Sequence, residues 1–352
     1  MSDYDYLNAR VRGMSTDLLT REFYEQVLSA SSETILLDAL LGSSYGTELQ
    51  EALARLGQGP VTHAIESALR SSAGAAFAQI LAAAPPEPRR LIALQLNRWD
   101  VANVVALLRA RLAGAEPHEA LAGVLPIGEL DESQLGELAA ETNMEGLADA
   151  LTTWKHPIAF ELRRAVHECG APHDPRALER ALYGAYFTWA LAQLRVGDPQ
   201  QRLVRDCICR HIDMMNLVAL LTRIRQKKEA GSVYGELFER GTLEEKSLLE
   251  LRSCETLEDA FESLVDTYLA PGVEKGILTY GQSQSLGVME RFLEAVAVER
   301  ACRLFRQDLL GIAVPLGFIW RKYCECVNLR LLARGALFRM PANAVRQELI
   351  LV

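Results

Sequence analysis

Ser44 is the residue whose surroundings most resemble a catalytic motif. It lies in Gly42-Ser-Ser-Tyr-Gly46, which fits the G-x-S-x-G pattern of a nucleophile elbow. That elbow needs a strand before the serine and a helix after it, whereas residues 32–41 have the pattern of a helix. We therefore expect a turn at a helix end. The alternative, a helical hydrolase with Ser44 as its nucleophile, predicts a hydrolysis activity that Ser44→Ala abolishes.

Metal and phosphate chemistry lacks its usual motifs in this chain. None of the six histidines belongs to an H-E-x-x-H pattern, and His167-Glu168 is followed by Cys169-Gly170-Ala171 instead of a second ligand. The chain has no G-x-x-x-x-G-K-[ST] loop and no G-x-G-x-x-G after a strand. We predict no catalytic, cofactor-binding or metal-binding residue, and no nucleotide site.

The seven cysteines also argue against a zinc or disulfide framework. Cys207-x-Cys209 and Cys324-x-Cys326 lack the C-x-x-C spacing, and a one-residue gap on a helix turns two thiols about 200° apart. The odd number of cysteines, with no signal-type leader before Tyr4, predicts a protein of the reducing cytosol.

Composition excludes two kinds of partner. The net charge is −9 and the basic residues are dispersed, so nucleic acid is not an expected partner. The longest apolar stretch, Leu309–Trp320, has 12 residues, whereas a membrane span needs about 20. Gly311, Pro315 and Gly317 within it predict a kinked, closely packed buried helix. Membrane association is expected only through a partner.

Helical signals run through the whole chain. Apolar residues recur at three- and four-residue steps from Leu286 to Leu304, so one face of a long helix is apolar. Four helix starts are predicted from capping residues. They are Thr242-x-x-Glu245, Thr256-x-x-Asp259, Asp174-Pro175 and Asp198-Pro199. Since no alternating run bounded by turns occurs, we predict an all-α fold.

A repeated glutamate marks the first element of an internal repeat. The pattern is an aliphatic residue, Glu, Ser or Arg, any residue, then Leu, and it contains Glu66, Glu179 and Glu290. The copies are separated by 113 residues (179 − 66) and 111 residues (290 − 179). A chain of 352 residues therefore has room for three copies.

An acid followed by asparagine three residues later marks the second element. Its copies are Asp100/Asn103, Asp213/Asn216 and Glu325/Asn328, with asparagines 113 (216 − 103) and 112 (328 − 216) residues apart. Gly128-x-Leu130 and Gly241-x-Leu243 form a third element, which the last copy replaces with a shorter connection to Pro341. A partial fourth copy, Asp5/Asn8, begins the chain.

The acid and the asparagine lie on one helix face, next to an apolar run. We predict that they join neighbouring helices, with the repeated Glu or a nearby Arg as candidate partners. The alternative, carboxylates converging on one functional site, conflicts with copies that pseudo-symmetry would hold apart. The repeat predicts a half-repeat at 1–30 and three pseudo-symmetric helical lobes at 31–140, 141–253 and 254–352.

Both ends of the chain resemble one known family. Tyr4-Asp-Tyr-Leu-Asn-Ala-Arg-Val-Arg12, and later Ser44-Tyr45-Gly46, are similar to the start of the C subunit of the V/A-type ATPases, called d in eukaryotes. Pro315-Leu-Gly317 and the segment 325–341, ECVNLRLLARGALFRMP, resemble its C-terminal signature in the prokaryotic form. The stretch 83–88 and Glu in place of Asp at 325 depart from the family pattern.

The resemblance implies a non-catalytic component of the central stalk, cytoplasmic and peripheral to the membrane. In this family three lobes form a funnel that receives the shaft, made of the D and F subunits, and sits on the proteolipid ring. Shaft and ring then turn together during ATP synthesis or ATP-driven ion transport. The runner-up is a generic helical repeat scaffold for soluble partners. A repeat near 113 residues exceeds the roughly 34–47 of common helical solenoids, which favours a closed three-lobed body.

Overall fold

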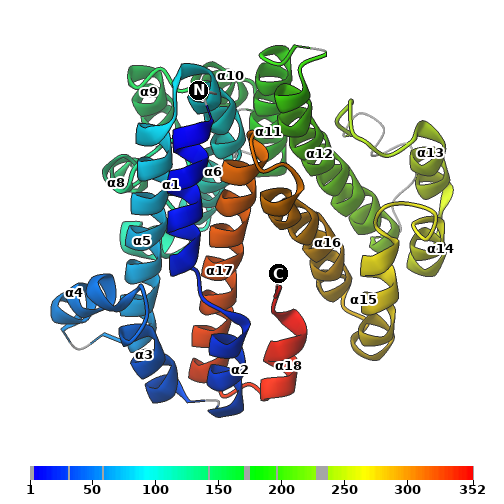
Figure 1. Cartoon of the computed structure of the whole chain (residues 1–352). Helices are drawn as coiled ribbons and strands as arrows, with labels where there is room; N and C mark the ends of the chain where they lie inside the picture. The colour runs from blue at the N-terminus through cyan, green and yellow to red at the C-terminus, as the bar shows by residue number, and fades with distance from the viewer. Residues whose placement is uncertain are drawn as a thin grey trace. The chain divides into compact units, whose positions relative to one another are not determined.

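The computed structural model describes residues 4–30, 32–57, 59–141, 143–169, 175–195, 197–226 and 237–351. It is 78% helical, and the described residues contain no β-strand (Figure 1). The predicted all-α fold is confirmed.

Three pairs of long helices follow one another along the chain, and each pair carries one copy of the repeated residues. The pairs are α5 (Val61–Ala83) and α6 (Pro86–Leu112), α11 (Pro175–Ala192) and α12 (Pro199–Arg225), and α16 (Leu286–Gln307) and α17 (Ala313–Leu337). The repeated Glu lies on the first helix of each pair, and the acid and asparagine lie on the second.

Shorter helices connect these pairs. Before α5 lie α1 (Asp5–Met14), the 3-10 turn η1 (Ser15–Asp17), α2 (Arg21–Ala30), α3 (Glu33–Leu41) and α4 (Gly46–Leu56). Between α6 and α11 lie α7 (Pro117–Ala122), α8 (Glu132–Ala140), α9 (Met144–Thr153) and α10 (Ala159–Cys169). After α12 come α13 (Glu245–Ser253), α14 (Leu257–Ser263) and α15 (Ala270–Ser283), and α18 (Ala342–Glu348) follows α17.

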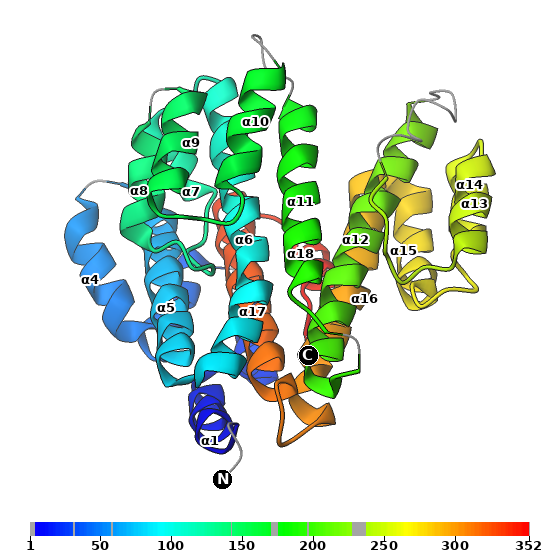
Figure 2. The same cartoon turned by 90° about the horizontal axis from the view of Figure 1, so that it is seen from above.

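The chain divides into two compact units. Unit 1 comprises Met1–Ala190 and Leu304–Val352, and unit 2 comprises Leu191–Arg303. In unit 1, α1, α5 and α17 lie side by side (Figure 1), and α2, α3, α4 and α18 complete an apolar core with α5 and α17. In unit 2, apolar residues of α12 to α16 form a second core (Figure 2). The four ranges predicted from the repeat stay a prediction.

Two of the four predicted helix starts are confirmed. Asp198 caps α12 by accepting hydrogen bonds from two backbone N–H groups of its first turn, and Thr256 accepts one from Asp259 N at the start of α14 (3.1 Å). The start predicted at Asp174 lies outside the described residues. The one at Thr242 is wrong, because the Thr242 hydroxyl instead donates to the Asp213 carboxylate.

The apolar stretch before and within α17 differs from its prediction. The helix begins only at Ala313, so Pro315 is in the first turn, where its missing N–H leaves no intrahelical bond unmade. Leu309 and Leu310 precede the helix and are exposed. The expected close packing is found at Gly317, where the backbone of Phe305 leaves no room for a Cβ atom.

One helix, α6, is long and apolar enough by length and composition to cross a membrane. However, 78% of the apolar window lies buried inside the protein, as in the core helix of a globular fold.

Candidate functional site: three buried carboxylate clusters

Two of the repeated acids hold the chain where it returns about 30 residues later. The Asp100 carboxylate, 0% exposed, accepts hydrogen bonds from Glu129 N (2.8 Å) and Leu130 N (3.1 Å). Asp213, also 0% exposed, accepts the equivalent bonds from Thr242 N (2.8 Å) and Leu243 N (3.1 Å). Each buried carboxylate therefore fixes the start of the short helices that follow.

Glycine is required next to each of these aspartates. A Cβ atom on Gly128 would overlap the Asp100 carboxylate, and one on Gly241 would overlap that of Asp213. The repeated Gly-x-Leu element thus supplies a backbone without a side chain at the glycine and an N–H group at the leucine.

The third acid, Glu325, obtains its backbone partner from a distant part of the sequence. The position equivalent to Leu130 would be residue 355 (325 + 30), and the sequence has 352 residues. Leu19 N donates to Glu325 Oε2 instead (2.5 Å), and Leu19 precedes Leu130 by 111 residues (130 − 19). The N-terminal segment, and not a shorter connection to Pro341, completes the third copy.

The repeated asparagines form a two-bond clamp with the same geometry in all three copies. Asn103 pairs with the backbone N–H and C=O of Leu125 (3.0 and 2.5 Å), and Asn216 does so with Phe238 (2.7 and 2.8 Å). Asn328 pairs in the same way with Ile350 (3.0 and 2.8 Å). Each partner lies 22 residues after the asparagine, so the amide holds the returning chain and not a neighbouring helix.

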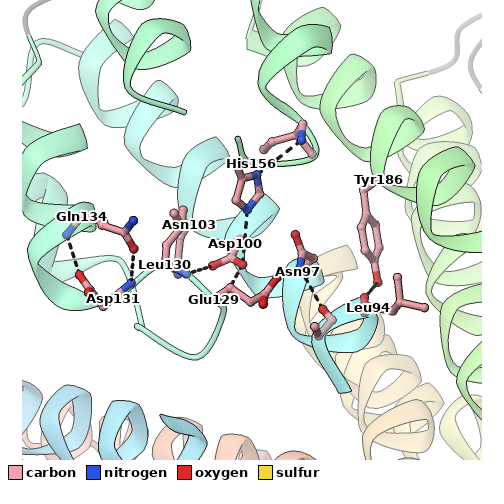
Figure 3. Close-up of polar contacts among 12 residues, drawn as sticks. Leu94, Asn97, Asp100, Asn103, Glu129, Leu130, Asp131, Gln134, His156 and Tyr186 are labelled. Carbon is pink, nitrogen blue, oxygen red and sulfur yellow. Dashed lines mark hydrogen bonds and ion pairs between the residues drawn. The ribbon is translucent and has the colours of Figure 1, made fainter. Parts of the chain in front are cut away.

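A third donor faces each carboxylate from another helix or its start. Tyr268 OH donates to Asp213 Oδ2 (3.2 Å) and Tyr45 OH donates to Glu325 Oε1 (2.7 Å). His156 takes this place beside Asp100, with Nε2 3.5 Å from Oδ2 (Figure 3). Its Nδ1 accepts from Ile158 N (3.5 Å), which assigns the ring proton to Nε2, facing the carboxylate.

Two of the clusters contain a cation, three residues before the acid. Lys322 Nζ lies 3.0 Å from Glu325 Oε1 and 4.2 Å from the centre of the Tyr45 ring. Arg210 lies over the Tyr268 ring at 4.4 Å. In the first cluster Asn97 takes this place and donates to Glu129 Oε2 (2.8 Å). The Asp100 cluster therefore uses neutral donors where the other two use charge as well.

Burial sets the electrostatics of these groups. It raises the pKa of Asp213, although hydrogen bonds from Thr242 and Leu243 act in the opposite direction. Burial also raises the pKa of Tyr268 and of Tyr45 well above the usual range, and the neighbouring carboxylates add to both shifts. The phenols thus remain protonated donors to the carboxylates at neutral pH.

The repeated glutamates lie outside these clusters and face arginines. Glu179 pairs with Arg109, and Glu66 lies 3.7 Å from Arg334; each arginine is six residues after a repeated asparagine (109 − 103, 334 − 328). Burial raises the pKa of Glu290, and nearby Arg225 opposes this shift. The nearby arginine expected from the sequence is thus the partner of the glutamates and not of the asparagines.

The N-terminal half-copy does not form a cluster. Asn8 is buried and its Nδ2 donates to Gly311 O (3.1 Å), so it holds the connection before α17 and not a returning chain. Asp5 is exposed on the first turn of α1. The sequence match at Asp5/Asn8 therefore does not correspond to the geometry of the other copies.

Sequence reasoning missed three donors and one backbone partner. Tyr45, His156 and Tyr268 are 111 (156 − 45) and 112 (268 − 156) residues apart, close to the spacing of the acids. The replacement of tyrosine by histidine hides this match from a search for identical residues. Leu19 is missed because its cluster joins two distant parts of the sequence.

The remaining candidate chemistry has structural explanations. Ser44 lies in the turn between α3 and α4, where its hydroxyl donates to Asp17 O (2.7 Å). Within the described ranges, no three His, Cys, Asp or Glu side chains are grouped so that they could hold a metal ion. The repeated residues thus define a fold of backbone-directed clamps.

These helices and clamps belong to a known class of protein. The chain is a member of the ATP synthase (C/AC39) subunit family, whose model matches residues 7–348. Members of this family are structural, non-catalytic components of rotary ATPases.

Relatives cover nearly the whole chain. The C subunit of the V-type ATP synthase of Thermus thermophilus is 28% identical over 99% of this chain and 98% of its own length. That of Deinococcus radiodurans is 25% identical over 98% and 91%. The C subunit of the A-type ATP synthase of Methanocaldococcus jannaschii is 22% identical over 99% and 87%.

The asparagine clamp can be tested in unit 2. Asn216→Ala leaves the backbone N–H and C=O of Phe238 without the amide, and we expect it to lower the free energy of unfolding by about 1–3 kcal/mol. Urea unfolding followed by circular dichroism measures this. Asn343→Ala, on an exposed position of α18, should change it by less than about 0.5 kcal/mol. Equal effects of the two variants would contradict the clamp.

The close approach at Gly128 gives a second prediction, of opposite sign in its control. Gly128→Ala forces a methyl group onto the Asp100 carboxylate and should destabilise the protein by about 1–3 kcal/mol. Gly136→Ala, in the middle of α8 with nothing within 4 Å, should stabilise it by about 0.5–1 kcal/mol. Thermal melts of both variants decide, and stabilisation by Gly128→Ala would refute the assigned geometry.

The Glu325 cluster should depend strongly on its cation. Lys322→Met leaves a buried carboxylate without its ion partner, and we expect a loss of about 3–5 kcal/mol in the free energy of unfolding. Lys275→Met, which removes the partly exposed pair with Glu299, should cost about 0–1 kcal/mol. The double variant Lys322→Met/Glu325→Gln should recover part of the loss; no recovery would show that the charge pair is not its cause.

Proposed function

We propose that the chain is the rotor component that couples the central shaft, made of the D and F subunits, to the proteolipid ring of a V/A-type ATP synthase. The observation that supports this most is the family match over residues 7–348, together with relatives that cover nearly the whole chain. In this role it transmits torque during ATP synthesis or ATP-driven ion transport. It works on the cytoplasmic side, peripheral to the membrane.

The clamps suit the mechanical demand of this role. A coupling protein must turn as a stiff body, and stiffness is favoured where each connection is tied to a long helix by several hydrogen bonds. Asn103 and Asp100 tie the chain after α6 in this way, and Asn328 with Glu325 ties segments near both chain ends to α17. As part of the proposal we retain the three repeat units, with residues 1–30 supplying Leu19 to the third.

An affinity isolation tests this function. A tagged copy, expressed in the source cells and extracted from membranes in mild detergent, should bring down D, F and the proteolipid ring, with one copy of the tagged chain per complex. Mass spectrometry with labelled standards gives the ratio. Recovery of the tagged chain alone from the cytosol, or with unrelated soluble proteins, would favour the generic scaffold instead.

A further inference from the structure

Two adjacent leucines are exposed immediately before the most buried helix of unit 1. The side chains of Leu309 and Leu310 are 56% and 73% exposed, whereas Ile312 and the next eight residues are buried. We call this pair the leucine tip. Large apolar side chains grouped on a surface usually mark a place where a partner binds.

The backbone of the leucine tip is held in place by α1 and by Asp308. Asn8 Nδ2 donates to Gly311 O (3.1 Å), and Arg12 Nη2 donates to Leu309 O (3.5 Å). Asp308 Oδ1 accepts from Leu310 N (3.0 Å). The start of α1 and the start of α17 consequently lie at the same end of unit 1 (Figure 1). The leucines therefore point outward from a preorganised turn, which lowers the entropic cost of docking.

Basic and aromatic groups surround the leucine tip. Arg12 lies over the Phe305 ring at 5.5 Å and Arg321 lies over it at 5.0 Å. Tyr6, on α1, is 60% exposed and accepts a hydrogen bond from Arg10 (3.4 Å). Of the acids here, Asp5 is exposed, and Asp308 already caps the turn. In a chain of net charge −9, this end is locally basic.

This combination fits a partner at a membrane surface. Arginine stems and tyrosine rings are favoured where apolar and aqueous phases meet, and the cytoplasmic membrane surface is negatively charged. Resting on the coupling function proposed above, we propose that the leucine tip is the docking surface for the cytoplasmic end of the proteolipid ring. Leu309 and Leu310 enter an apolar depression in the ring, and Arg10 and Arg12 face acidic groups on its rim.

The test compares tagged complexes of three chains: wild type, Leu309→Glu/Leu310→Glu, and Phe160→Glu. Phe160 is 72% exposed on α10 of the same unit and serves as the matched control. The double variant should recover D and F as the wild type does but lose the ring by about tenfold or more, the change that follows from about 1.4 kcal/mol of binding. Phe160→Glu should keep both, and Leu309→Met/Leu310→Met should retain the ring.

Several outcomes would overturn the leucine tip as ring contact. Unchanged ring recovery in the double variant would do so, as would loss of D and F together with the ring while the thermal melt stays unchanged. Binding of the purified chain to vesicles of anionic phospholipid, lost in the double variant while ring recovery persists, would assign the tip to lipid. If the wild type recovers neither shaft nor ring, the coupling function itself fails.

Discussion

A buried carboxylate that captures the returning backbone is the interaction on which the rest of this structure depends. A carboxylate inside a protein is tolerated only when hydrogen bonds or a cation replace its hydration. Asp100 and Asp213 meet this condition with consecutive backbone N–H groups, so the following connection must stay in one place. The asparagine three residues later holds the same connection a few residues earlier, and the glycine leaves space for the acid.

The same constraint explains why two distant parts of the sequence meet in unit 1. The last copy has its own acid and asparagine, but the donors to Glu325 come from Leu19 and Tyr45. The longer glutamate side chain reaches this separate segment, whereas aspartate serves the two clusters whose backbone partners lie in the same connection. A contact between residues 306 positions apart makes unit 1 depend on both segments.

The sequence predicted the helices and the repeat better than the contacts they make. Periodicity and capping indicated an all-α fold, and equal spacing located the residues that now form three equivalent clamps. Spacing could not tell that Asn216 reaches a backbone 22 residues ahead, because a side chain's partner depends on how the connection folds back. It also selected Asp5/Asn8, since a three-residue pattern carries no information on burial of the acid. Leu309 and Leu310 were expected in a buried helix because their apolar run continues unbroken into α17.

Backbone-directed contacts also explain how a fold persists while most of its sequence changes. A carboxylate that binds N–H groups makes no demand on the side chains of the residues it holds, as Glu129 and Thr242 at equivalent positions show. Only the donors around it must remain compatible, and histidine replaces tyrosine beside Asp100. Identities of 22–28% over nearly full-length relatives are consistent with so few fixed positions. The surfaces that meet partners are then free to differ from copy to copy, because the internal clamps do not involve them.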